Sequence, residues 1–151
     1  MLLPIVFLVG VLLLAVGISG LQRRPMPPVT FLVGALLLLV GIFGFAGSKS
    51  HALHALIPAA LGALLILCAA VARNVKARMH AMHVAVLLAF LGFLGGLPGL
   101  FHVPALLAGT STVPPLAVAS RSATAILCLD YVVVAIRSFI QARRSRLAAQ
   151  A

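Results

Sequence analysis

Residues 29–46 read VTFLVGALLLLVGIFGFA, a stretch without one charged side chain. Four further runs are predominantly apolar, at residues 2–21, 52–72, 79–97 and 117–140. Each run is close to the ~20 residues that cross a bilayer as a helix. In hydrocarbon every backbone N–H and C=O needs a partner within the protein, so apolar runs of this length predict helices. The predicted fold class is therefore all-α, an integral membrane bundle of five transmembrane helices.

The composition supports a membrane protein over a soluble one. Hydrophobic residues make up 64% of the chain, charged residues make up 8%, and the mean hydropathy is +1.27. These values lie far outside the usual range of soluble domains. We expect a single membrane domain over residues 1–151, with a basic cytoplasmic tail at 141–151.

The basic residues predict how the chain is inserted. Of the eleven lysines and arginines, nine lie near the run ends that fall on one side of the membrane. These nine are Arg23, Arg24, Arg73, Lys76, Arg78, Arg137, Arg143, Arg144 and Arg146. Only Lys49 and Arg121 lie near the run ends on the other side. Because basic residues near span ends stay in the cytoplasm, the pattern predicts an outside N-terminus and a cytoplasmic C-terminus.

The same charges indicate lipid and not nucleic acid as the partner. They lie at span ends and lack the interleaved aromatic residues of a nucleic-acid groove. Arg143, Arg144 and Arg146 suit the anionic lipids of the inner leaflet.

The chain opens with a tandem repeat. FLVGVLLLAVGISG at 7–20 returns as FLVGALLLLVGIFG at 31–44, so residues 1–24 look like a copy of residues 25–48. Small residues let membrane helices approach closely, and glycines recur along one helix face in both copies and again in the fourth run. The predicted packing positions are Gly10, Gly17, Gly20, Gly34, Gly41, Gly44, Gly92 and Gly96. We expect these glycine faces either to pack the bundle or to meet a partner.

Residues 98–116 differ from the runs on either side. They contain Pro98, Pro104, Pro114 and Pro115. Proline lacks the N–H that a helix needs, so we expect an outside loop over 98–116, with at most one helical turn near residues 105–108.

Asp130 is the only acidic residue and lies near the middle of the last run. An ionisable group at that depth is a functional hypothesis by default. Its own helix offers no hydrogen-bonding side chain three or four residues away, and His83 lies at an overlapping depth. One hypothesis is a buried pair of Asp130 with His83, helped by His80, that relays protons. The alternative is a neutral Asp130 bonded to a backbone carbonyl or to Tyr131 of a neighbouring copy.

The remaining histidines suggest a second kind of site. Two His-x-x-His pairs begin successive antiparallel runs, so they lie on opposite sides of the membrane and cannot form one four-ligand site. His51, His54 and His102 share the outer side, where they are candidate ligands for a metal or for haem. The alternative is that they are interfacial histidines, with no metal and no cofactor. The two cysteines lie inside apolar runs and favour burial over metal binding.

Three stretches carry a resemblance to a known group. They are ALIPA at 55–59 followed by Gly62, RMHAMH at 78–83 leading to LGFLG at 91–95, and RSFI at 137–140 with Arg143 and Arg144. Together they resemble a family of small, uncharacterised bacterial membrane proteins of about four spans, over residues 29–146. The extra N-terminal copy departs from that pattern. The resemblance implies a bacterial cytoplasmic (inner) membrane and implies no activity, substrate or cofactor.

Three functions are compatible with these residues. We expect a non-enzymatic accessory or packing subunit in a homo-oligomer or larger membrane complex. A single carboxylate provides too few groups for a catalytic triad or a pair of catalytic carboxylates. The first alternative is a small proton-coupled transporter that uses Asp130 and His83. The second is a haem or metal redox subunit that uses His51, His54 and His102.

Overall fold

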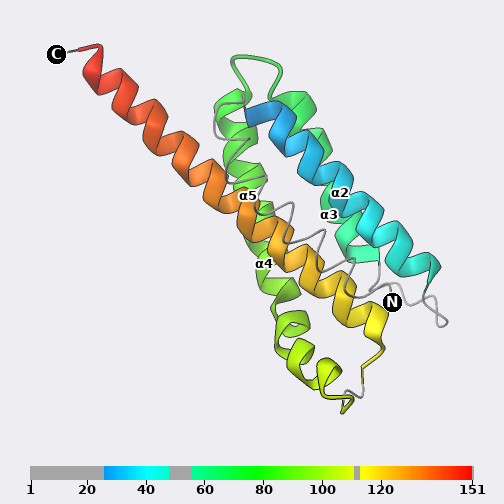
Figure 1. Ribbon diagram of the computed structural model, residues 1–151. Coiled ribbons are helices and arrows are strands. Elements are labelled where there is room, and N and C mark those ends of the chain that lie inside the picture. The colour runs from blue at the N-terminus through cyan, green and yellow to red at the C-terminus, as the bar shows by residue number, and fades with distance from the viewer. Residues whose placement is uncertain (1–25, 48–55, 111–112, 151) are drawn as a thin grey trace.

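The computed structural model describes residues 26–47, 56–110 and 113–150 and forms four helices there. In chain order they are α2 (Met26–Ala46), α3 (Ile57–Val71), α4 (Arg78–Leu107) and α5 (Pro115–Ala148). No strand occurs among these residues (Figure 1). The predicted all-α class is confirmed. The first apolar run, at 2–21, lies outside the described residues.

Three of the helices are long and apolar enough to cross a membrane. They cover Pro27–Ala46, Arg78–Leu107 and Pro115–Ala148. At 1.5 Å per residue, the 15 residues of α3 span about 22 Å, less than the ~30 Å of a hydrocarbon core. The predicted run at 52–72 begins in a segment outside the described residues. The described chain therefore has the helices of a membrane protein.

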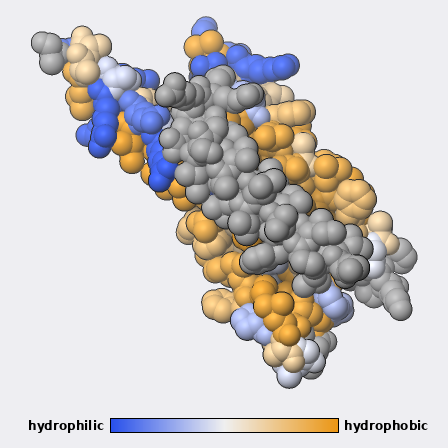
Figure 2. All heavy atoms as spheres, in the orientation of Figure 1, coloured by the Kyte–Doolittle hydropathy of each residue, from blue (hydrophilic) through white to orange (hydrophobic). Residues whose placement is uncertain are grey.

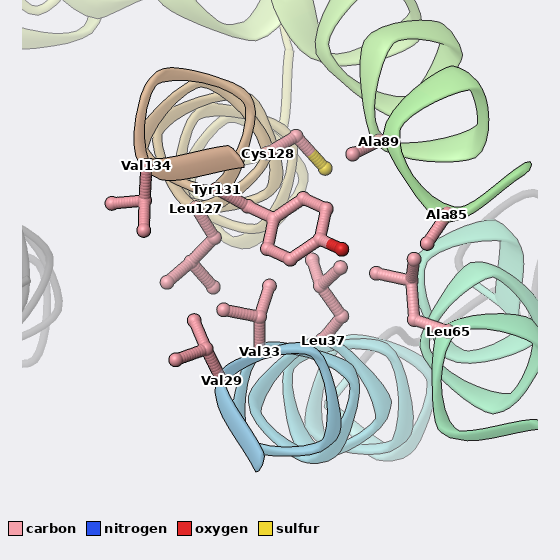
Figure 3. Close-up of a cluster of buried hydrophobic side chains, with 10 residues drawn as sticks. All are labelled: Val29, Val33, Leu37, Leu65, Ala85, Ala89, Leu127, Cys128, Tyr131 and Val134. Atoms are coloured by element: carbon pink, nitrogen blue, oxygen red, sulfur yellow. The ribbon is translucent and has the colours of Figure 1, made fainter. Parts of the chain in front are cut away.

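The helices pack as two antiparallel pairs that join into one bundle (Figure 1). α2 packs on α3 and α4 packs on α5, while contacts between α3 and α4 and between α2 and α5 close the bundle. The buried centre combines residues of all four helices (Figure 3). It contains Val29, Val33, Leu37, Leu65, Ala85, Ala89, Leu127, Cys128, Tyr131 and Val134.

Side-chain size separates the inside of α4 from its outside. Its buried positions are almost all small: Ala81, Ala85, Ala89, Gly92, Gly96 and Gly99, with Met82 as the exception. Its large apolar side chains are exposed, among them Leu87, Phe90, Leu91 and Leu94. Where the described residues are visible in Figure 2, most of the surface between the two ends of the bundle is apolar. A helix that is apolar all round is typical of a membrane span.

The expected loop at 98–116 is much shorter in the structure. α4 continues through Pro98 and Pro104 to Leu107, and α5 begins at Pro115. Proline removes one backbone hydrogen bond, but packing against a neighbouring helix offsets that loss inside membrane proteins. In α4 this packing comes from Gly96 and Gly99, which lie directly on α5.

α4 ends where a glycine allows the chain to turn. Gly109 has a φ of +71°, in the left-handed region. Its N–H bonds to Leu106 O at 3.2 Å and the Thr110 N–H bonds to Ala105 O at 3.0 Å, which is the Schellman pattern of helix ends. Gly109, and not Pro98, terminates this helix.

α5 extends beyond its predicted end. The expected span stops at residue 140, whereas the helix continues to Ala148. The residues expected to form a basic tail are thus helical almost to the end of the chain, and residues 141–150 are all exposed.

Candidate functional site

Glycines bring α2 and α3 into backbone contact. A Cβ atom at Gly34 would lie 2.8 Å from Gly62 O, and one at Gly62 would lie 2.5 Å from Gly34 O. A Cβ atom at Gly41 would lie 2.7 Å from Ala59 Cα. Contacts this short leave no room for a side chain, so these positions require glycine.

A second set of glycines joins α4 to α5. A Cβ atom at Gly92 would lie 2.8 Å from Cys128 Sγ, and one at Gly96 would lie 2.7 Å from Arg121 O. A Cβ atom at Gly99 would lie 2.7 Å from Ser122 N. Gly95, one residue before Gly96, would meet nothing within 4 Å. Only the glycines on one face of α4 are needed for packing.

These contacts show how the bundle uses its glycine faces. Gly34, Gly41, Gly92 and Gly96 all lie inside it, Gly44 is also buried, and Gly10, Gly17 and Gly20 lie outside the described residues. Glycine faces already occupied within one chain give no reason to expect a partner. Support for an accessory role must therefore come from another feature of the protein surface.

A buried polar cluster joins three helices. The hydroxyls of Thr30 on α2 and Tyr131 on α5 lie 2.9 Å apart, and Thr30 Oγ1 lies 3.9 Å from Met82 Sδ on α4. Thr30 is 0% and Tyr131 1% exposed. The Tyr131 ring lies in the centre of the core, with its hydroxyl pointing toward Ala85 of α4 (Figure 3). The cluster therefore fixes α2 against the α4–α5 pair.

The sequence carries a signal for this cluster that the predictions above did not use. Thr30 is the only side chain in residues 29–46 able to hydrogen bond, and Tyr131 is the only tyrosine of the chain. Buried hydroxyls in membrane helices find partners on neighbouring helices. Tyr131 was expected only as a partner of Asp130 across two copies, whereas the structure pairs it with Thr30 within one chain.

His83 lies on the flank of the α4–α5 pair. Its Nδ1 atom lies 2.7 Å from Met79 O in its own helix, and its ring stacks on Phe139 of α5 with centroids 5.3 Å apart. His83 is exposed, as is His80 one turn earlier. Both predicted relay histidines thus lie at the surface of the bundle.

The structure does not form the predicted pair of Asp130 with His83. His83 contacts Phe139, which lies nine residues after Asp130, or about 14 Å along the α5 axis. The depth of Asp130 was counted from Arg137 as the cytoplasmic end of the span, whereas α5 continues to Ala148. The actual register places Asp130 near the level of Leu91, two turns beyond His83.

Asp130 itself lies half-buried on the side of α5, next to the fully buried Tyr131. Within the described ranges its carboxyl makes no hydrogen bond and no ion pair. By contrast, every buried side-chain N or O atom of the described residues has a partner. The carboxyl is therefore an acidic group in the transmembrane region that this part of the chain leaves without a partner.

Asp130 belongs to a charged line along one edge of α5. Asp130, Arg137 and Arg144 follow one another at intervals of seven residues, which on a helix places them nearly above one another. Asp130 is half-buried, while Arg137 and Arg144 are exposed. We call these three residues the α5 seam. It runs from the apolar middle of α5 to its basic end.

The candidate metal ligands are only partly described. His102 is exposed, with its Nδ1 atom 2.6 Å from Pro98 O, and His51 and His54 lie outside the described residues. No group of three or more histidines, cysteines or acidic residues occurs in the part of the chain that the structure describes. Both cysteines are unpaired thiols, with Cys128 buried and Cys68 partly buried.

Comparisons with protein-family models, with curated proteins and with solved structures give no match for this chain. The class of protein therefore follows from its fold and surface. Over residues 26–47, 56–110 and 113–150 it is a helical membrane-type bundle with apolar sides, paired polar groups inside and one unmatched carboxyl on its flank.

Proposed function

We propose that this chain is a five-span protein of a bacterial cytoplasmic membrane, with its N-terminus outside and its C-terminus inside. Its role is that of a non-enzymatic accessory subunit, which docks through the α5 seam onto a membrane helix of another protein. The observation that carries this proposal is the half-exposed carboxyl of Asp130 on an apolar flank, unmatched by the described residues.

An unpaired carboxyl at this depth destabilises the inserted protein. A charged aspartate near the middle of a membrane helix costs at least ~2.5 kcal/mol. The described part of the bundle pairs its own buried polar atoms and supplies no donor to Asp130. A partner helix with a hydroxyl, amide or basic group at the same depth would offset the cost. The seam thus favours binding to a helix that carries such a donor.

The residues of the α5 seam favour a different protein as the partner, and not a second copy of this chain. Copies inserted in the same direction and related by a two-fold axis would place Asp130 opposite Asp130 and Arg137 opposite Arg137 on this edge. Like groups directly opposite each other in an apolar medium repel when charged. A helix of another sequence is free of that constraint.

Site-specific photocrosslinking in living cells tests the docking. A photoreactive residue at Ile126 or Val133, on either side of Asp130, should give an adduct with a different protein. The same residue at Leu87, a 65% exposed position on the outside of α4, is the matched control and should give none. Asp130→Leu should abolish the adduct and Asp130→Asn should retain it, because the amide still hydrogen bonds.

Three results would overturn the docking proposal. They are an equal adduct from Leu87, an adduct unchanged by Asp130→Leu, or an adduct of twice the 15.6 kDa mass of the chain, which would indicate a second copy. The topology is tested separately. Reporters fused in the α3–α4 turn and after the C-terminus should report the cytoplasm, and one at Thr110 the outside.

A further inference from the structure

The turn between α3 and α4 carries a dense group of cations. Arg73, Lys76 and Arg78 fall within six residues and are all exposed. Asp130 is the only acidic residue of the chain and lies well inside α5, so no acidic side chain neutralises this turn. An uncompensated group of three cations attracts an anion.

Hydrogen bonds hold the turn in one conformation. The Lys76 N–H bonds to the side-chain oxygen of Asn74 at 3.1 Å, and the Arg78 N–H bonds to Asn74 O at 2.9 Å. The Arg78 Nε–H donates to Ala72 O at 3.3 Å, which anchors its guanidinium to the end of α3. Among the described residues, the remaining side-chain N–H groups of Arg78 make no hydrogen bond. The cations are thus presented by an ordered backbone.

The packing of α4 on α5 brings a second basic segment to the same level. Two contacts fix the alignment of the antiparallel helices: Gly99 lies on Ser122, and His83 lies on Phe139. Between these two contacts α4 contains 16 residue steps and α5 contains 17, so the helices stay aligned. Five residues before His83 on α4 is Arg78, and five after Phe139 on α5 is Arg144. Figure 2 shows the strongest blue at this end of the molecule, on both elements. The α3–α4 turn and the end of α5 therefore lie in one layer.

Exposed apolar side chains accompany the cations. Val75 at the tip of the turn is 78% exposed and Met79 is 63% exposed. On α5, Ile140 and Leu147 are exposed beside the arginines. Apolar side chains next to cations suit the boundary between acyl chains and headgroups, and no aromatic residue lies in the turn to stack on a nucleic-acid base.

We propose that the α3–α4 turn binds the phosphate of an anionic phospholipid, at the same depth as the basic end of α5. Arg73, Lys76 and Arg78 hold the phosphate oxygens, while Met79, in the first turn of α4, lies against the acyl chains. Guanidinium groups suit this role because they bind phosphate through two parallel hydrogen bonds. The inference rests on the membrane insertion proposed above and does not depend on docking through the α5 seam.

Native mass spectrometry of the purified full chain in mild detergent tests the site. Phosphatidylglycerol or phosphatidylcholine is added at equal concentration, and the bound fraction is compared. We expect phosphatidylglycerol to bind at least about tenfold more tightly than phosphatidylcholine, in line with a charge-assisted contact. Arg121→Gln, which removes an exposed cation at the opposite end of α5, is the control and should leave this preference unchanged.

Two substitutions that keep the net charge separate a built site from diffuse attraction. Asn74→Ala removes the side-chain bond to Lys76, and Arg78→Lys removes the planar guanidinium. Both also keep the cations that direct insertion. Each should lower phosphatidylglycerol binding several-fold, with the helix content by circular dichroism unchanged.

The outcomes are separable. Unchanged binding in both variants, or an equal loss in Arg121→Gln, would overturn the site and leave only general attraction to anionic lipid. Displacement by an equal concentration of inorganic phosphate would identify free phosphate as the ligand and also overturn it. None of these results bears on photocrosslinking at Ile126 and Val133, so each proposal can fail by itself.

Discussion

Substituting Gly96 by alanine should destabilise the bundle through one contact. The new Cβ atom would lie 2.7 Å from Arg121 O and 2.8 Å from Ala125 N, both backbone atoms of α5. Ordinary van der Waals contact begins near 3.4 Å, so α4 and α5 would have to separate by about 0.7 Å locally. Overpacking of this kind costs about 1–3 kcal/mol.

The preceding residue provides a matched control. Gly95→Ala adds the same methyl group one position earlier, where nothing lies within 4 Å. Both variants gain the same helix propensity, because alanine is favoured over glycine inside a helix by about 0.5–1 kcal/mol. The difference between the two variants therefore isolates the contact with α5 and should amount to about 1–3 kcal/mol.

The assay is reversible unfolding of the purified protein in mixed micelles, followed by far-ultraviolet circular dichroism as the denaturing detergent increases. Gly95→Ala should match or exceed the parent in free energy of unfolding, and Gly96→Ala should fall below both. Equal stability of the two variants would refute the close approach of α4 and α5, and with it the register that places Arg78 level with Arg144.

Two further predictions concern the polar cluster and the end of α4, both measured by the same unfolding assay. A double-mutant cycle of Thr30→Val and Tyr131→Phe should give a coupling free energy of about 0.6 kcal/mol and at most ~1.7 kcal/mol, the range found for hydrogen bonds between membrane helices; zero coupling would mean that the two hydroxyls do not interact. Gly109→Ala should lower stability by about 1–2 kcal/mol, because its φ of +71° is unfavourable for a residue with a Cβ atom, and Gly109→Asn should lower it less. Equal effects of alanine and asparagine would contradict the Schellman ending.

The helical class could be predicted from the sequence because backbone N–H and C=O groups in hydrocarbon must be hydrogen bonded within the protein. The second run, predicted at 29–46, corresponds to α2 at Met26–Ala46. The predicted end of α4 was wrong because Pro98 was treated as a helix breaker. That rule holds where no neighbour compensates, and here Gly99 packs on α5 directly after the proline.

Pairing between helices was harder to predict than their existence. Asp130 and His83 were matched by depth, which was counted in α5 from Arg137, although α5 continues to Ala148. The side of the helix that faces a neighbour was also unknown. Tyr131 follows Asp130 directly, yet it is 1% exposed and bonded to Thr30, while Asp130 lies half-exposed without a described partner. One residue along a helix is a rotation of about 100°, which separates inside from outside.

In α4, side-chain size and not hydrophobicity indicates which face of the helix is inside. Water does not surround the spans, so an apolar residue gains little by moving from lipid to the core, and van der Waals packing decides the arrangement. α4 shows the result: Ala85, Ala89 and Gly92 face inward, while Leu87 and Leu91 face outward. A search for small residues at intervals of three and four would have found this face without the structure. Such a search says nothing of Asp130, whose place outside the packed face is the reason to look for its partner in another protein.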